Sequence, residues 1–64
     1  MGIKISLAAA RVNAGLTQKE AAKKIGVSIT TIKNWEKGLT SPKFKLFDTI
    51  CEVYVIPVDN IKFF

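Results

Sequence analysis

The chain has 64 residues, 48% of them hydrophobic, which is enough for one small core but too little for a core plus an enclosed active site. Ten lysine and arginine residues against five acidic ones give a formal net charge of +5, which suits a polyanionic partner and equally suits a solvated surface that aids solubility. Histidine is absent and Cys51 is the single cysteine, so groups for metal ligation and acid–base catalysis are scarce. We therefore expect a single domain over residues 1–64 with no metal, no cofactor and no enzymatic activity.

The sequence favours a cytoplasmic protein. Cys51 has no partner for an internal disulfide, and its position four residues after Phe47 predicts an inert, buried thiol. No apolar run reaches the roughly 18 residues of a membrane span, and the N-terminal stretch lacks the basic-then-apolar order of a signal peptide. Met1-Gly2 with Ser6 matches the myristoylation pattern, which is short enough to arise by chance.

The first predicted helix runs from Ile5 to Ala14. Leu7, Ala10 and Ala14 form one apolar stripe, and Gly15 stands where a glycine commonly ends a helix.

The next segment carries the strongest local signals in the chain. Thr17 followed three residues later by Glu20 is a capping box, which starts a second helix that runs to Ile25. Gly26 provides the left-handed residue that a tight turn needs, and Ser28 caps a third helix over residues 28–37. Two short helices joined by a tight glycine turn are typical of a helix-turn-helix.

The third helix has two chemically different faces. At 100° per residue one face carries Ser28, Ile32, Trp35 and Glu36. The opposite face carries Thr30, Lys33, Asn34 and Lys37, with Ile29 at its edge.

The remaining residues predict two further helices. Ser41 caps and Pro42 opens a fourth helix, whose apolar stripe comprises Phe44, Phe47, Ile50, Cys51 and Tyr54. Residues 58–61 predict a short final helical turn after Pro57. Residues 53–56 (VYVI) also have strand propensity, so a short C-terminal strand is the alternative there. The predicted fold class is all-α with five helices.

These residues together resemble the Cro/lambda-repressor (XRE) helix-turn-helix family over nearly the whole chain. The resemblance is carried by residues 16–22 (LTQKEAA), 25–28 (IGVS) and 35–38 (WEKG), by Ile32, and by the later segments 41–42 (SP) and 56–61 (IPVDNI). It implies the five-helix lambda-repressor-like fold and an ion pair between Arg11 and Glu36.

Two positions depart from the family pattern. Val55 stands where a glycine is common at the end of the fourth helix, and because a β-branched residue resists positive φ we expect this end to be built differently. Ala21 replaces a larger aliphatic residue, so another side chain, such as Trp35, Phe44 or Phe47, is expected to fill the space.

The resemblance also implies sequence-specific binding of double-stranded DNA, with helix 28–37 in the major groove. The residues expected to read bases are Ile29, Thr30, Lys33 and Asn34. Those expected to contact phosphates are Arg11, Thr17, Gln18, Ser28, Lys37 and Lys43. Lys19, Lys23 and Lys24 leave two options open, since they either add to the phosphate contacts or form only the solvated side of the second helix.

The expected function is therefore that of a bacterial or phage transcriptional regulator, a repressor in the first instance, associated with the nucleoid. The alternatives are a DNA-binding antitoxin, a restriction-control protein, or a protein-interaction module on the same fold. A homodimer on palindromic sites is an option, since small modules often bind that way. Val58, Ile61, Phe63 and Phe64 would form its interface unless the terminal phenylalanines fold back on the core. No membrane partner and no small-molecule ligand are expected.

Overall fold

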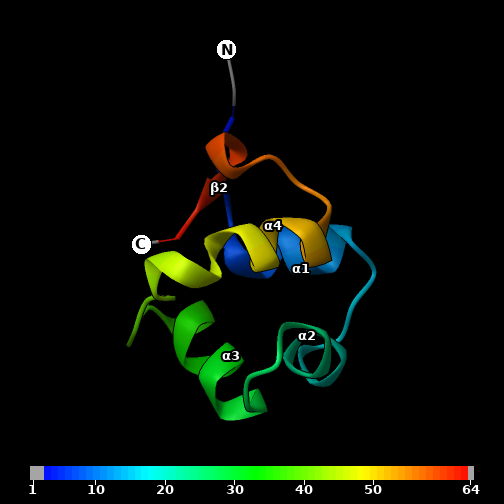
Figure 1. Ribbon diagram of the computed structural model, residues 1–64, viewed down its shortest axis with the longest axis vertical. Coiled ribbons are helices and arrows are strands. Elements are labelled where there is room, and N and C mark those ends of the chain that lie inside the picture. Colours follow the sequence, from blue (N-terminus) through cyan, green and yellow to red (C-terminus); the bar gives the residue numbers. More distant parts are fainter. Residues whose placement is uncertain (1–2, 64) are drawn as a thin grey trace.

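The structure is a computed structural model that describes residues 3–63. Its elements in chain order are β1 (Ile5–Ser6), α1 (Leu7–Asn13), α2 (Gln18–Ile25), α3 (Ile29–Lys37), the 3₁₀ turn η1 (Phe44–Leu46), α4 (Phe47–Tyr54), the 3₁₀ turn η2 (Val58–Asn60) and β2 (Ile61–Lys62). Figure 1 shows α1 and α4 side by side across the middle, with α2 and α3 together at one end and the short strands at the other. The described part of the chain is thus a mostly helical domain with four α-helices, where five helices were predicted.

The helix-turn-helix forms as predicted. The Thr17 hydroxyl accepts from the Glu20 amide at 3.1 Å, and the Glu20 carboxylate accepts from the Thr17 amide at 2.9 Å, which completes the capping box. Gly26 ends α2 with a φ of 90°, and the Ser28 hydroxyl then accepts from the Thr31 amide at 3.1 Å to start α3. These local signals are read correctly from the sequence because every hydrogen bond in them spans three or four residues.

The prediction that the first helix begins at Ile5 was wrong. Ser6 is the N-cap of α1, because its hydroxyl accepts from the Ala9 amide at 3.1 Å. Ile5 and Ser6 instead form β1, which pairs in parallel with β2 in the register Ile5 to Ile61 and Ser6 to Lys62. The residues expected as a final helical turn therefore divide into η2 and the start of β2.

The fourth helix also begins later than predicted. Ser41 caps no helix, and η1 starts after Lys43 without a side-chain cap, so α4 begins only at Phe47. Phe44 is consequently 85% exposed and does not belong to the core stripe. The 3₁₀ geometry places it beside Phe47, with ring centroids 5.3 Å apart, on the solvent side of the domain. The strand alternative for residues 53–56 was wrong as well, since α4 continues to Tyr54.

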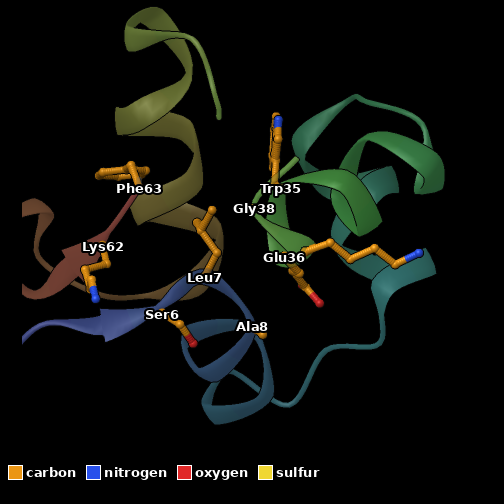
Figure 2. Close-up of a pocket in the computed structure, with 9 residues that line it drawn as sticks. Ser6, Leu7, Ala8, Trp35, Glu36, Gly38, Lys62 and Phe63 are labelled. Carbon is orange, nitrogen blue, oxygen red and sulfur yellow. The ribbon is translucent and has the colours of Figure 1, made fainter. Parts of the chain in front are cut away.

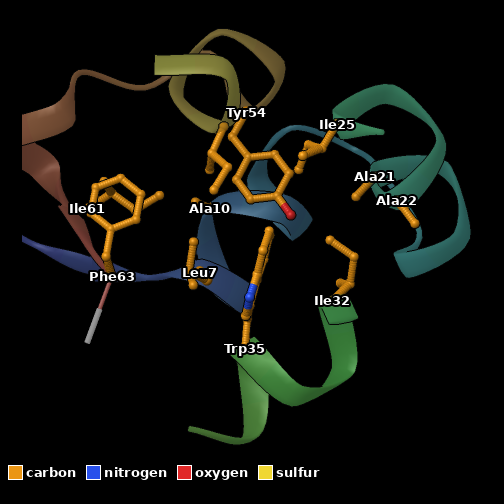
Figure 3. Close-up of a cluster of buried hydrophobic side chains, with 11 residues drawn as sticks. Leu7, Ala10, Ala21, Ala22, Ile25, Ile32, Trp35, Tyr54, Ile61 and Phe63 are labelled. Carbon is orange, nitrogen blue, oxygen red and sulfur yellow. The ribbon is translucent and has the colours of Figure 1, made fainter. Parts of the chain in front are cut away.

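The core lies between all four helices and the short sheet (Figure 3). Its buried hydrophobic members are Leu7, Ala10, Ala21, Ala22, Ile25, Ile32, Trp35, Ile50, Tyr54, Ile61 and Phe63. Ala21 is fully buried without any help from the exposed Phe44, and Trp35 and Tyr54 project into the middle of the cluster. Cys51 is only partly buried, contrary to expectation, and this burial raises the pKa of its thiol.

The C-terminal end folds back on the core. Phe63 is buried and its ring stacks on Phe47, with centroids 3.8 Å apart and planes within 4° of parallel. Ile61 is buried too, so of the residues predicted for a dimer face only Val58 is exposed among those that the structure describes. Phe64 lies outside the described residues.

Val55 ends α4 in the left-handed conformation, with φ 54° and ψ 53°. The expectation that this residue would avoid positive φ was wrong. The Val55 amide donates to the Glu52 carbonyl at 3.3 Å and the Ile56 amide to the Cys51 carbonyl at 3.0 Å, so the helix end closes around a left-handed residue as it would around glycine. The valine side chain is 84% exposed and gains no burial that would offset the steric cost.

We predict that Val55→Gly stabilises the protein and that Val55→Ala does so much less. Left-handed backbone costs an L-residue about 1–2 kcal/mol, and glycine avoids this cost. We expect the free energy of unfolding of Val55→Gly to be about 1 kcal/mol higher than that of Val55→Ala, which reverses the order of the two residues inside a helix. Thermal unfolding of the wild type and the two variants measures this difference. A variant series in which alanine is the more stable would contradict the left-handed cap.

Candidate nucleic-acid interface

The exposed face of α3 is the candidate site. Ile32 and Trp35 are buried beneath the helix, so the opposite side of α3 faces solvent. Thr30, Lys33 and Lys37 are exposed on that side. Ile29 is 39% exposed at the start of the helix, so part of its apolar side chain is open to solvent. The structure therefore leaves three of the four predicted base-reading side chains open to solvent.

Asn34 is the least exposed of the predicted base readers. It is half-buried, and its carbonyl accepts from the Leu39 amide at 3.0 Å where the chain leaves the helix. Among the described residues its side-chain amide makes no hydrogen bond within the protein, so its donor and acceptor are available to a ligand.

An ion pair fastens the other side of α3 to α1, as predicted. Arg11 donates from Nε to Glu36 Oε2 at 2.7 Å and from Nη2 to Glu36 Oε1 at 3.2 Å. Arg11 Nη1 also donates to the Leu16 carbonyl at 2.8 Å, so the guanidinium holds the loop before α2 as well. The two side chains are 14% and 9% exposed, and the hydrogen bonds that Arg11 donates to Glu36 raise the pKa of Arg11. A charge-assisted, two-point contact of this kind fixes direction as well as distance.

Gln18 joins the same network, which the sequence did not reveal. Its amide Nε2 donates to Glu36 Oε1 at 3.0 Å, so the side chain predicted to contact phosphate lies against α3. The Gln18 backbone amide is the first of α2 and has no intrahelical acceptor, so it forms part of the positive end of the helix dipole. No local pattern signals the side-chain contact, because the two residues are 18 positions apart.

Tyr54 of α4 lies close enough to Glu36 and Arg11 to feel their charges. It is buried, and this burial raises its pKa to about 12, with a further contribution from the nearby Glu36 carboxylate and an opposing one from Arg11. Side chains from all four α-helices therefore surround the Glu36 carboxylate or lie close enough to feel its charge.

The other predicted phosphate contacts are exposed residues at the starts of α2 and α3 and at the end of α3 and beyond it. The hydroxyls of Thr17 and Ser28 both act as helix caps, and Ser28 Oγ also shares a hydrogen bond with Thr31 Oγ1 at 2.9 Å. The capping contacts with Thr17 lower the pKa of Glu20. Lys37 and Lys43 are exposed at the end of α3 and in the loop that follows it.

Positive charge is concentrated in the part of the chain that contains α2 and α3. Residues 17–45 hold seven lysines and two glutamates, and one of these glutamates is Glu36, which Arg11 neutralises. The rest of the chain holds three basic and three acidic residues and is balanced. The whole net charge of +5 therefore comes from the segment that presents the α3 face, which favours an anionic partner for this face over a general solubility role.

A shallow hollow lies beside α3 (Figure 2). It is lined by Ser6, Leu7 and Ala8 at the start of α1, by Trp35 to Gly38, and by Lys62 and Phe63. Its one acid, Glu36, is held by Arg11 and Gln18. Within residues 3–63 no group of histidine, cysteine and acidic residues is placed to hold a metal, and no helix is long and apolar enough to cross a membrane.

The chain matches a known family. A family model described as helix-turn-helix (HTH_3) covers residues 7–60. The chain belongs to this XRE-type helix-turn-helix family. The match includes α1 to α4 and η2, so the site described above lies entirely within it.

Two curated relatives are similar to the chain. One is the cryptic phage CTXphi transcriptional repressor RstR of Vibrio cholerae, 38% identical over 51 residues, which are 80% of this chain and 46% of the repressor. The other is an uncharacterized HTH-type transcriptional regulator of Archaeoglobus fulgidus, 37% identical over 54 residues, 84% of this chain and 77% of that protein. The chain thus spans less than half the length of the first relative. No solved structure matches it with significance.

We predict that Tyr54, the single tyrosine, ionises in the folded protein at about pH 12. Its folded pKa lies above the unfolded value near 10.0, so the neutral phenol stabilises the fold fully below pH 10, and this contribution is lost as the pH rises toward 12. Two pKa units correspond to on the order of 2–3 kcal/mol in the free energy of unfolding.

Tyrosinate absorbance, followed with and without denaturant, measures both ionisations. The Tyr54→Phe variant is the control for unfolding, since it keeps every other residue of the chain but lacks the tyrosine contribution. Equal midpoints for native and denatured protein would contradict a buried hydroxyl beside Glu36.

Proposed function

We propose that the protein binds double-stranded DNA in a sequence-specific manner with α3 in the major groove, and that it regulates transcription, as a repressor of phage or bacterial type. The observation that carries this proposal is the exposed face of α3, which is backed by a rigid core and lies in the segment that holds the whole net positive charge. Membership of the helix-turn-helix family and the names of the two relatives support the regulatory role.

Each side chain on the face suits a particular base edge. Asn34 can pair through its amide donor and acceptor with adenine, and Lys33 can donate to guanine O6 and N7. Ile29 offers apolar surface to a thymine methyl group, and Thr30 can make either kind of contact. In this arrangement α3 reads sequence with four side chains along one stripe.

Phosphate contacts would frame the helix on both sides. The free backbone amides at the start of α2, next to Thr17 and Gln18, suit an anion because the helix dipole points there. Ser28 at the start of α3, Lys37 in its last turn and Lys43 in the loop that follows would reach phosphates around the groove. Arg11 already donates to Glu36 and Leu16, so its part in phosphate binding would depend on its remaining N–H donors.

Selection of duplexes from a random pool, repeated at two salt concentrations, tests the proposal. A sequence-specific binder enriches a defined motif at both, with weaker binding at the higher concentration. An interaction module for an acidic protein, the main alternative, would bind duplexes only as weakly as its charge dictates and enrich none. That result would overturn the proposal.

Asn34→Ala and Lys43→Ala should have distinct effects on binding. Loss of Asn34 should cost about 1–3 kcal/mol on the selected duplex and relax preference at one base position. Loss of Lys43 should weaken all duplexes alike and flatten the dependence of log K on log salt by about one unit. Fluorescence titrations over a salt series measure both, and unchanged base preference in Asn34→Ala would show that α3 lies in a different register.

We further propose that two copies occupy a palindromic site. One nine-residue helix covers few base pairs, and paired half-sites lie about one helical turn apart in such complexes. The interface would use Leu39 and Phe44, which are 70% and 85% exposed, and not the buried Ile61 and Phe63.

Phe44→Ser should therefore weaken binding to a palindrome while leaving an isolated half-site unaffected, since it removes apolar contact area between copies and no DNA contact. Val12→Ser is the matched control, because Val12 is also exposed, at 62%, but lies on α1. Sedimentation with each duplex reports the stoichiometry. One copy per palindrome at saturation would contradict the dimer.

A further inference from the structure

The contact between Gln18 and Glu36 has no counterpart in the roles that the sequence predicts. Glu36 Oε1 accepts from Gln18 Nε2 at 3.0 Å and from Arg11 Nη2 at 3.2 Å, while Oε2 accepts from Arg11 Nε at 2.7 Å. The carboxylate of α3 is therefore held from two directions, by a cation on α1 and by a neutral amide on α2. All three hydrogen bonds are partly buried.

We infer that Gln18 is a positioning residue for base readout, which holds α3 in its reading orientation through Glu36. This inference rests on the proposed function and deepens it, because it names a residue that sets sequence discrimination without touching a base. It differs from the expected role of Gln18, which is a phosphate contact with no influence on base preference.

The geometry of α3 explains why a second anchor matters. The helix is fixed at its start by the turn at Gly26 and the cap at Ser28, whereas Glu36 lies in its last turn. At 1.5 Å per residue these two points are about 12 Å apart. Ile32 and Trp35 seat α3 in the core, and Arg11 grips the Glu36 carboxylate along one edge. The Gln18 bond from α2 adds a second polar contact at the same carboxylate, which opposes rotation of α3 about its own axis. Recognition geometries tolerate errors of only about 0.5 Å, so a small roll is enough to misalign Lys33 and Asn34.

The two roles of Gln18 predict different losses. If Gln18 only bound a phosphate, Gln18→Ala would weaken specific and non-specific duplexes by the same factor, because phosphates carry no sequence information. If Gln18 positions α3, the specific duplex loses more. We expect the ratio of specific to non-specific affinity to fall about tenfold, as befits one hydrogen bond to a charged acceptor.

Two further substitutions of Gln18 test whether the hydrogen bond to Glu36 sets the discrimination between duplexes. Gln18→Lys keeps a donor for Glu36 and should retain the discrimination ratio, although its added charge raises affinity for every duplex. Gln18→Glu places a second carboxylate against Glu36 and should lose discrimination at pH 7. The Gln18→Glu variant should regain discrimination toward pH 5, because its protonated carboxyl has the shape of the glutamine amide and can donate to Glu36 Oε1.

The experiment measures binding of wild type and the three variants to the selected duplex and to a scrambled one, at pH 5 and pH 7. Lys19→Ala, on the neighbouring exposed residue of α2, is the control for a general loss of affinity. Amide hydrogen exchange without DNA adds an independent readout, in which Gln18→Ala should accelerate exchange in the last turn of α3 and Gln18→Lys should not.

The outcomes separate the two proposals. A wild-type protein that does not discriminate between duplexes would overturn the proposed function. A wild type that discriminates, with a ratio unchanged in Gln18→Ala, would overturn the inference about Gln18 alone. If Gln18→Ala fails to fold, Gln18→Glu decides through its pH dependence, since a ratio equally low at both pH values would also overturn the inference.

Discussion

The contact between Arg11 and Glu36 is the constraint on which the rest of the molecule depends. It is the point where α1 is tied to α3, and the same guanidinium holds the loop before α2 through the Leu16 carbonyl. Removing one partner of a fully buried pair costs about 3–5 kcal/mol, and even a part of that is a large share of the stability of a small domain. The ion pair fixes the position of α3 against α1 and leaves the opposite face of α3 exposed to solvent.

Packing and charge divide α3 between two tasks. Ile32 and Trp35 anchor the helix in the core, and Glu36 locks its last turn, so that none of these three is available to a ligand. The exposed side of the same nine residues carries the groups suited to base edges. The segment that contains α3 also holds the net positive charge, which suits the proposed attraction of a polyanion to this part of the molecule.

The strained end of α4 illustrates how tertiary structure overrides local preference. Val55 is the one non-glycine residue with positive φ in the described chain, and valine itself gives no sign of it, although the family pattern commonly has glycine at this position. The position of Tyr54 beside the ion pair and the return of the chain to β2 fix where α4 ends, so the residue there adopts the conformation that closure requires. The stacking of Phe63 on Phe47 is decided in the same way, by contacts between segments 16 residues apart.

The sequence by itself determined the helix-turn-helix. The capping box at Thr17, the glycine at Gly26, the cap at Ser28 and the two faces of α3 are all local patterns, whose hydrogen bonds join residues within one turn. Tertiary structure alone decided the pairing of β1 with β2, the stacking of Phe63 on Phe47 and the contact of Gln18 with Glu36. Each of these depends on which distant residue arrives at the same place, and a single sequence contains no periodic signal for contacts between segments that are far apart in the chain.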